Sequence, residues 1–319
     1  MHLSSRLSNN IKFIDLFAGI GGMRIPFEEL GGECVFTSEI DKFAQQTYEA
    51  NFNEKPFGDI KEATKSDETI KEHIPKHDIL LAGFPCQAFS QAGKRKGFED
   101  TRGTLFFDIA KILKVMNPKA FLLENVKGLR GHDQGNTIKR ITEIIVDLGY
   151  YPSYEVLNSK DFGLPQNRER IFIVGLKESM FNFQLVNVPK VPTQVRDILE
   201  KKSVTEDYKI STRLHKSHKR RKIEHKKNNR GFGFSLKKPS DPHTNTLSAR
   251  YYKDGSEILI DRGGQKNPRM LTPREAARLQ GFPESFEIPV SKNQAYKQFG
   301  NAVSVNVVRE IAKVLVKNL

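Results

Sequence analysis

A cysteine stands directly after an apolar segment, in Gly83-Phe84-Pro85-Cys86-Gln87, and the preceding run from Asp78 to Ala82 predicts a buried strand. A thiol on the turn that ends a strand is placed to react rather than to pack. Two later segments bring reactive groups to the ends of apolar runs: Glu124-Asn125-Val126 and Gln166-Asn167-Arg168-Glu169-Arg170. Because strand ends in an open α/β sheet converge on one crevice, the sequence predicts a site with one nucleophile, one carboxyl and two guanidiniums.

A glycine loop, Phe17-Ala18-Gly19-Ile20-Gly21-Gly22, follows the first predicted strand and precedes a helix. Its glycines let the backbone approach a ligand closely, although the spacing is not the Gly-x-Gly-x-x-Gly of a dinucleotide site. Glu39 ends the second predicted strand, 20 residues after Gly19, where a carboxylate accepts hydrogen bonds from ribose hydroxyls. This pattern fits NAD and S-adenosylmethionine equally well.

The elements that position these residues alternate in type from Lys12 to Leu176, as a doubly wound parallel sheet with crossover helices requires. Apolar residues at helical spacing predict one helix around 105–116 and another around 138–148, the second ended by Gly149. After about Pro189 the alternation gives way to charged and turn residues, and a helix is predicted to begin at Thr272-Pro273. We predict strands at 13–17, 34–39, 79–83, 120–124, 154–158 and 171–175.

The composition of the 319 residues, 37% of them hydrophobic, predicts a folded protein with a real core. No long apolar run or signal peptide is evident, and the two cysteines are too few for a disulfide framework, so we expect a cytoplasmic protein. Cys34, inside an apolar strand, is interpreted as an inert filler. The net charge of +14 is typical of a nucleic-acid binder, and the one-sided basic run from Lys209 to Arg230 suits phosphate contact, although a charge run is usually only a solvated face.

These motifs, in this order, resemble the DNA cytosine-5 methyltransferases of bacterial and phage modification systems. The resemblance implies a Rossmann-like catalytic domain over 1–185, completed by a helical segment at 292–319, and a smaller, mostly β or irregular target-recognition domain over 186–291. It also decides the cofactor in favour of S-adenosylmethionine. The cofactor-binding residues that it implies are Phe17, Ala18, Gly19, Ile20, Gly21, Gly22, Glu39, Ile40, Asp59, Ile60, Asn301 and Ala302.

The resemblance assigns the chemistry to four residues. A Cys86 thiolate adds to C6 of cytosine, which makes C5 nucleophilic towards the sulfonium methyl. Glu124 hydrogen-bonds N3 and the exocyclic amine of the base. Arg168 and Arg170, two residues apart on a predicted strand, are expected to point the same way and to hold Glu124 and the base O2. The segment from Ser90 to Phe98 is expected to close over DNA from which the base is flipped out.

Double-stranded DNA is the implied partner, and the reading of its sequence is assigned mainly to the second domain. The predicted DNA-binding residues are Gln87, Ser90, Lys94, Arg95, Thr246, Leu247, Arg250, Tyr251 and Arg262, although a hairpin turn at 253–255 would explain part of this pattern without base contact. The segments 231–234 and 246–255 look most like enzymes for CC(N or W)GG or CCGG sites. We expect a monomer, with any companion restriction endonuclease acting separately.

Three other functions fit parts of this pattern. An RNA cytosine-5 methyltransferase would use the same scaffold, whereas a dedicated basic domain favours duplex DNA. A non-catalytic DNA-binding module is disfavoured by Cys86 together with an intact Glu124. An NAD-dependent oxidoreductase is disfavoured by the glycine spacing.

Overall fold

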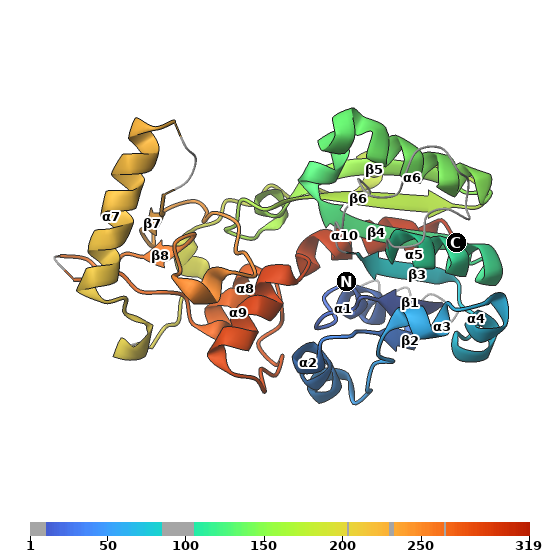
Figure 1. Cartoon of the computed structure of the whole chain (residues 1–319), viewed down its shortest axis with the longest axis horizontal. Helices are drawn as coiled ribbons and strands as arrows, with labels where there is room; N and C mark the ends of the chain where they lie inside the picture. Colours follow the sequence, from blue (N-terminus) through green and yellow to red (C-terminus); the bar gives the residue numbers. More distant parts are fainter. Residues whose placement is uncertain (1–10, 85–104, 203, 230–232, 265) are drawn as a thin grey trace, which may run out of the picture. The chain divides into compact units, whose positions relative to one another are not determined.

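A computed structural model describes residues 11–84, 105–202, 204–229, 233–264 and 266–319 (Figure 1). The chain divides into two compact units: unit 1 is Met1–Leu157, Glu169–Asn187 and Val307–Leu319, and unit 2 is Asn158–Arg168 and Val188–Asn306. This division differs from the predicted boundaries at 185 and 292. The segment 158–168 belongs to unit 2, and so do residues 292–306, which were expected to complete the first domain.

Unit 1 is built on a six-stranded sheet with the order β2-β1-β3-β4-β6-β5. The pairs β1–β2, β1–β3 and β3–β4 are parallel, whereas β4–β6 is antiparallel, so the expectation of a parallel sheet was wrong for β6. All six predicted strands are confirmed. Their bounds are β1 Lys12–Leu16, β2 Glu33–Ser38, β3 Ile79–Gly83, β4 Ala120–Val126, β5 Tyr151–Asn158 and β6 Glu169–Leu176.

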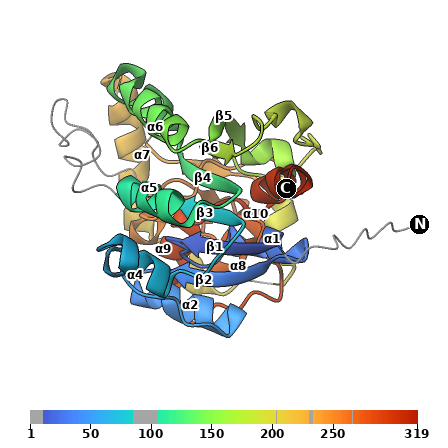
Figure 2. The same cartoon turned by 90° about the vertical axis from the view of Figure 1, so that its right-hand side faces the viewer.

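Helices cover both faces of this sheet. Figure 2 shows α4, α5 and α6 on one side and α1 and α10 on the other. The buried faces of α5 and α6 contribute Ile109 and Ile141 to the main apolar core, as their spacing predicted. Their bounds are α1 Arg24–Glu29, α2 Lys42–Phe52, α3 Ile60–Ala63, α4 Asp67–His73, α5 Leu105–Met116, α6 Asn136–Asp147 and α10 Val305–Lys317.

The last helix returns to unit 1, because residues from Val307 onward cluster with it. Arg309 fixes α10 to α1 through Glu29, with Nε–Oε2 and Nη2–Oε1 distances of 2.6 and 2.9 Å. Of the predicted helical segment 292–319, the part that returns to unit 1 is therefore α10 from Val307 onward.

The described residues of unit 2 contain more helix and less strand than expected. Its strands, β7 Leu236–Lys237 and β8 Leu259–Ile260, are short and pair in parallel. No hairpin turn forms at 253–255, because Tyr251–Lys253 is a 3₁₀ turn, η8, after which Gly255 takes a φ of +63°. The helices of unit 2 are α7 Thr212–Lys227, α8 Pro273–Leu279 and α9 Lys292–Asn301. Further 3₁₀ turns lie in unit 1 at Lys127–Gly135 and Phe183–Leu185, and in unit 2 at Ser159–Phe162, Val195–Ile198 and Glu206–Tyr208.

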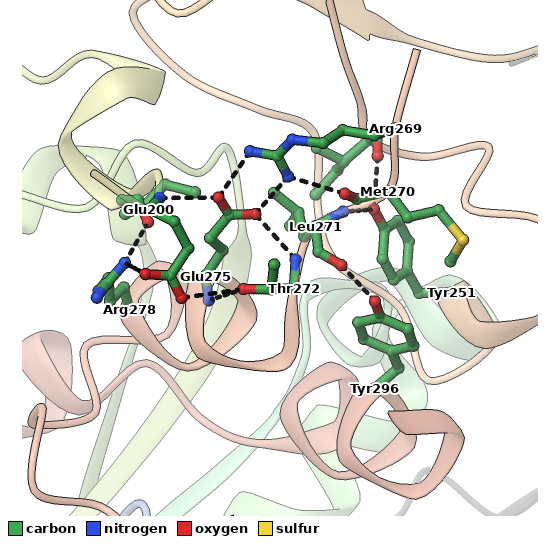
Figure 3. Close-up of polar contacts among 11 residues, drawn as sticks. Glu200, Tyr251, Arg269, Met270, Leu271, Thr272, Glu275, Arg278 and Tyr296 are labelled. Atoms are coloured by element: carbon green, nitrogen blue, oxygen red, sulfur yellow. Dashed lines mark hydrogen bonds and ion pairs between the residues drawn. The ribbon is translucent and has the colours of Figure 1, made fainter. Parts of the chain in front are cut away.

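Helix α8 begins as its sequence predicts, with Thr272 as the N-cap and proline at the first helical position. Its Glu275 is fully buried and forms a two-bond ion pair with Arg269, both N–O distances being 2.7 Å (Figure 3). The same carboxylate accepts from the backbone N–H groups of Thr272 and Glu200 at 2.8 and 2.9 Å. Four donors thus compensate the buried charge, which makes this pair a structural anchor of unit 2.

Within the described residues, every helix is too short or too polar to cross a membrane.

Candidate functional site

The glycine loop connects the end of β1 to α1 through backbone conformations that few side chains tolerate. Phe17, Gly19 and Gly21 have φ values of 55°, 57° and 81°. A Cβ on Gly19 would meet nothing within 4 Å, whereas one on Gly21 would lie 2.3 Å from the Phe52 ring. Gly21 therefore serves close packing on α2, and Gly19 leaves open space beside the backbone, where a ligand can approach.

Glu39, directly after β2, fastens this loop. Its Oε2 accepts from the Gly19 N–H at 2.8 Å, and its Oε1 accepts from the Asp41 N–H at 2.7 Å. Burial raises the pKa of Glu39, and the backbone N–H groups of Asp41 and Gly19 oppose that shift because they stabilise the carboxylate. The next side chain, Ile40, is 68% exposed.

The segment around Asp59 lies beside the same strand end, because the Glu39 N–H donates to the Phe57 carbonyl at 3.0 Å. Asp59 caps α3 by accepting from the Lys61 N–H at 3.0 Å. Ile60 is buried in the core, so its side chain is not available to a ligand. The structure thus brings the predicted loop, Glu39 and the Asp59 segment together at one edge of the sheet.

Polar side chains that the sequence interpretation missed, those of Asp15, Arg24 and Tyr48, are buried next to the glycine loop. Arg24 donates to Tyr48 Oη at 2.9 Å and lies over the Phe52 ring, 4.4 Å from its centroid. Asp15, at the end of β1, is 1% exposed, and burial raises its pKa to about 8. Burial also raises the pKa of Cys34 to about 12, which agrees with its interpretation as an unreactive thiol.

The catalytic carboxyl predicted at position 124 lies where β3 and β4 end. Glu124 pairs in register with Gly83, and a Cβ on that glycine would lie 3.7 Å from Glu124 Oε2. Arg170 Nε is 3.1 Å from Glu124 Oε1, and the two side chains are 18% and 11% exposed. Burial lowers the pKa of Arg170, and the carboxylate of Glu124 opposes this shift. The structure therefore brings Glu124 and Arg170 together in a partly open position.

Asn125 is a second residue to which the sequence interpretation gave no role. It is 2% exposed, and its Nδ2 donates to the Phe84 carbonyl at 2.9 Å. This bond fixes the last described residue before the predicted nucleophile. The predicted residues Cys86, Gln87, Ser90, Lys94 and Arg95 lie outside the described residues.

Arg168 does not share the environment of Arg170. Its guanidinium is buried within unit 2 and donates to the carbonyls of Leu247, Gly300 and Ala302 at 3.0, 3.2 and 2.7 Å. Arg168 and Arg170 were predicted to point the same way because both were placed on one strand. This was wrong, since side chains alternate in direction only within a strand and β6 begins at Glu169. The contacts of Arg168 favour a structural role.

Gln166, which the sequence interpretation also left without a role, completes this buried junction. It has no exposed surface, donates to the Leu279 carbonyl at 3.0 Å and accepts from the Leu247 N–H at 2.8 Å. The predicted cofactor residues Asn301 and Ala302 lie at the end of α9 in unit 2. The Ala302 carbonyl is engaged by Arg168, and Asn301 is exposed.

Two of the predicted DNA-binding side chains are buried. Leu247 and Tyr251 have no exposed surface, and the Tyr251 hydroxyl donates to the Ile258 carbonyl at 2.7 Å. A side chain without exposed surface cannot reach a base, so only the backbone of these two residues is left to meet DNA. Tyr252, next in the chain, is 40% exposed.

The other candidates in unit 2 differ in how they are held. Thr246 donates its hydroxyl to the Asn167 carbonyl at 2.7 Å. Arg262 forms an ion pair with the exposed Glu206 and lines a polar cavity of about 460 Å³. Arg250 is exposed at the start of η8. Arg250 is therefore the predicted reading residue that is best placed to meet a ligand.

Known proteins resemble this chain in sequence over nearly its whole length. Residues 11–317 match the family model described as C-5 cytosine-specific DNA methylase. Type II methyltransferase M.DsaV of Dactylococcopsis salina is 57% identical over 306 residues, which cover 95% of this chain and 85% of the relative. Type II methyltransferase M1.ScrFI of Lactococcus lactis subsp. cremoris is 56% identical over 321 residues, which cover 99% and 80%.

A solved structure shares the architecture. The Dnmt2 methyltransferase of S. pombe matches with a TM-score of 0.79 over 97% of this chain and 99% of that chain, at 22% identity. At this identity the likeness shows the fold alone, and it confirms the predicted Rossmann-like α/β class.

Proposed function

Because this chain belongs to the C-5 cytosine-specific DNA methylase family and is a DNA cytosine methyltransferase, we propose that it uses S-adenosylmethionine and a covalent cysteine adduct. The observation that carries this proposal is a convergence at one edge of the sheet. The parallel strands β1 to β4 end there with the glycine loop, Glu39, Gly83 and Glu124. In open α/β sheets this edge is where ligands bind.

The cofactor residues fit S-adenosylmethionine on their donor and acceptor chemistry. Each carboxylate oxygen of Glu39 accepts one backbone N–H, so lone pairs remain for two ribose hydroxyls. The open space at Gly19 admits the cofactor close to the backbone. When bound, the cofactor supplies an electrophilic sulfonium methyl. Asp59 and the exposed Ile40 are assigned to the adenine end.

The protein's own groups then activate the cytosine. A Cys86 thiolate forms a bond to C6, C5 takes the methyl group, and loss of the C5 proton expels the sulfur again. Electron density pushed into the ring is relieved at N3 by a hydrogen bond from Glu124, which is why this carboxyl must share a proton with the base. Arg170, 3.1 Å from Glu124, orients that carboxyl and stabilises its charged form.

Sequence reading is assigned to unit 2, with Arg250 as the leading candidate for a guanine contact. The two relatives carry the name Type II methyltransferase. We propose that this chain acts in a restriction-modification system of the cytoplasm, as a monomer and with a separate nuclease. The proposed target has the form CC(N or W)GG or CCGG.

The test is methyl transfer from labelled S-adenosylmethionine to matched duplex DNA and RNA containing these sites. We expect label at C5 of cytosine in DNA, and a Cys86→Ser variant that binds DNA but has no turnover, because a neutral hydroxyl adds to C6 poorly. Cys34→Ser serves as the matched control and should retain activity, since that thiol is largely buried and its pKa is raised. Preferential labelling of RNA, or near-normal turnover by Cys86→Ser, would contradict the proposal.

A further inference from the structure

Helix α7 carries an unusual concentration of positive charge. Its 16 residues include eight lysines and arginines and a single acid, Glu224. Half of the chain's net charge of +14 therefore lies in this one helix. The predicted site residues do not include any part of α7, and the sequence left open whether its charge contacts phosphate or only faces solvent.

One face of α7 is fixed to the rest of unit 2. His218 is 1% exposed and stacks on Phe234, with ring centroids 5.7 Å apart. Its Nε2 lies 3.1 Å from the Asp254 carbonyl, and Arg221 Nη2 is 3.1 Å from Asp254 Oδ2. A Cβ on Gly233 would come within 2.5 Å of the α7 backbone, so the helix rests directly on that glycine.

These attachments leave the charge on the opposite face. Burial lowers the pKa of His218, and it is bonded as a neutral ring, so the attached face does not depend on its charge. Arg221 forms an ion pair with Asp254, and its side chain is 38% exposed. The remaining cations are mostly exposed, and four of them share one face at spacings of three, four and seven residues: Arg213, Lys216, Arg220 and Lys227.

This stripe keeps its positive charge despite the one acid beside it. Arg220 Nε lies 3.7 Å from Glu224, and the two side chains are 78% and 60% exposed. An exposed pair of this kind contributes little and does not organise the surface. The stripe extends over about 21 Å, at 1.5 Å of rise per residue. One strand of duplex DNA presents a phosphate every 3.4 Å or so of helix axis, so several phosphates fall within this length.

We propose that the exposed stripe of α7 binds the phosphate backbone of duplex DNA and positions the enzyme on it without reading sequence. Flexible lysine and arginine side chains along an exposed helix face supply charge complementary to phosphates, and their chemistry does not distinguish one backbone phosphate from another. This inference rests on the proposed function only in taking duplex DNA as the ligand.

The test measures how DNA affinity depends on salt. The stripe variant combines Arg213→Gln, Lys216→Gln, Arg220→Gln and Lys227→Gln. The control variant removes the same net charge from exposed lysines of unit 1, on or near α3 and α4, and combines Lys61→Gln, Lys65→Gln, Lys71→Gln and Lys76→Gln. Each lost phosphate contact lowers the slope of log affinity against log salt by about 0.9. We expect the stripe variant to lose at least about 1.8 in slope and the control to lose less than one contact's worth.

Further arms separate the proposal from folding and from other partners. A charge-preserving variant, with Arg213→Lys, Lys216→Arg, Arg220→Lys and Lys227→Arg, should restore the slope. Equal slopes for the stripe and control variants would overturn the proposal, and so would a loss confined to duplex RNA. A wild-type protein that fails to methylate DNA at low salt would instead refute the proposed function, so the two failures are distinguishable.

Discussion

Two glutamate–arginine pairs, one in each unit, have the same chemistry and opposite surroundings. Glu275 and Arg269 in unit 2 form two 2.7 Å bonds, and the carboxylate, which has no exposed surface, accepts two backbone N–H groups as well (Figure 3). Glu124 and Arg170 in unit 1 approach at 3.1 Å, and both side chains keep some exposed surface.

The difference indicates what each pair does. A buried pair whose donors and acceptors are matched on all sides is inaccessible to a substrate, and its loss is expected to affect folding. A pair at a strand end that remains partly open can meet a ligand, and its loss is expected to affect the reaction. What distinguishes the two glutamate–arginine pairs is therefore whether a ligand can reach them, rather than the distance between their charged atoms.

If Glu275 tolerated neutralisation, the distinction between a structural and a catalytic pair would fail. Glu275→Gln leaves the Arg269 charge buried without its counter-charge, so we expect the free energy of unfolding to fall by about 3–5 kcal/mol. Chemical denaturation of unit 2 or of the whole chain measures this loss. The matched control is Glu284→Gln, whose partner Arg278 lies 2.6 Å away but whose own side chain is 66% exposed, and it should cost about 1 kcal/mol or less. Equal losses for both variants would contradict the structural assignment.

The opposite result is expected at the open pair. Glu124→Gln keeps the shape of the side chain but cannot share a proton with N3 in the same way, so the single-turnover rate should fall on the order of 10²-fold. Thermal stability should change little. Glu169→Gln is the control, because Glu169 pairs with Lys127 at 2.9 Å, has a side chain that is 41% exposed and lies next to Arg170. An unchanged rate for Glu124→Gln would remove this carboxyl from the mechanism.

The same contrast explains which parts of the structure were predictable from sequence. Strands such as β2 and β4 and helices such as α5 and α6 are marked by apolar residues at a fixed period, and the two strand ends place Glu39 and Glu124 at the shared edge. The reversed direction of β6 was not predictable in this way, because a buried strand is an apolar run whichever way it points.

Unit 2 was harder to predict because its order depends on distant contacts. Helix α7 has almost no apolar face of its own, and it is held by Phe234 and Asp254, which follow it in the chain. Arg168 is similar, since its carbonyl partners lie 79 to 134 residues away. Local periodicity carries no information on such contacts. The sequence therefore marked α7 only by its charge and Arg168 only by its place in a motif.

Arg250 provides the finest test of the contrast, because Arg168 shows what a structural arginine of unit 2 looks like. The Arg168 guanidinium is buried among three carbonyls, whereas Arg250 is exposed. If Arg250 reads a guanine, Arg250→Ala should cost about 1–3 kcal/mol of discrimination at one position of the target, since a two-bond arginine–guanine contact contributes that much. Methylation mapped across random duplexes measures this directly.

The expected pattern is new tolerance at a single guanine, with cofactor binding unchanged. Arg196→Ala removes an exposed arginine from the same unit and should leave site choice as it is. A phosphate contact would instead weaken methylation of all sequences alike. Such a uniform loss would assign Arg250 to positioning, together with the α7 stripe. Arg262 would then be the next candidate, although it must leave its ion pair with Glu206 before it can reach a base.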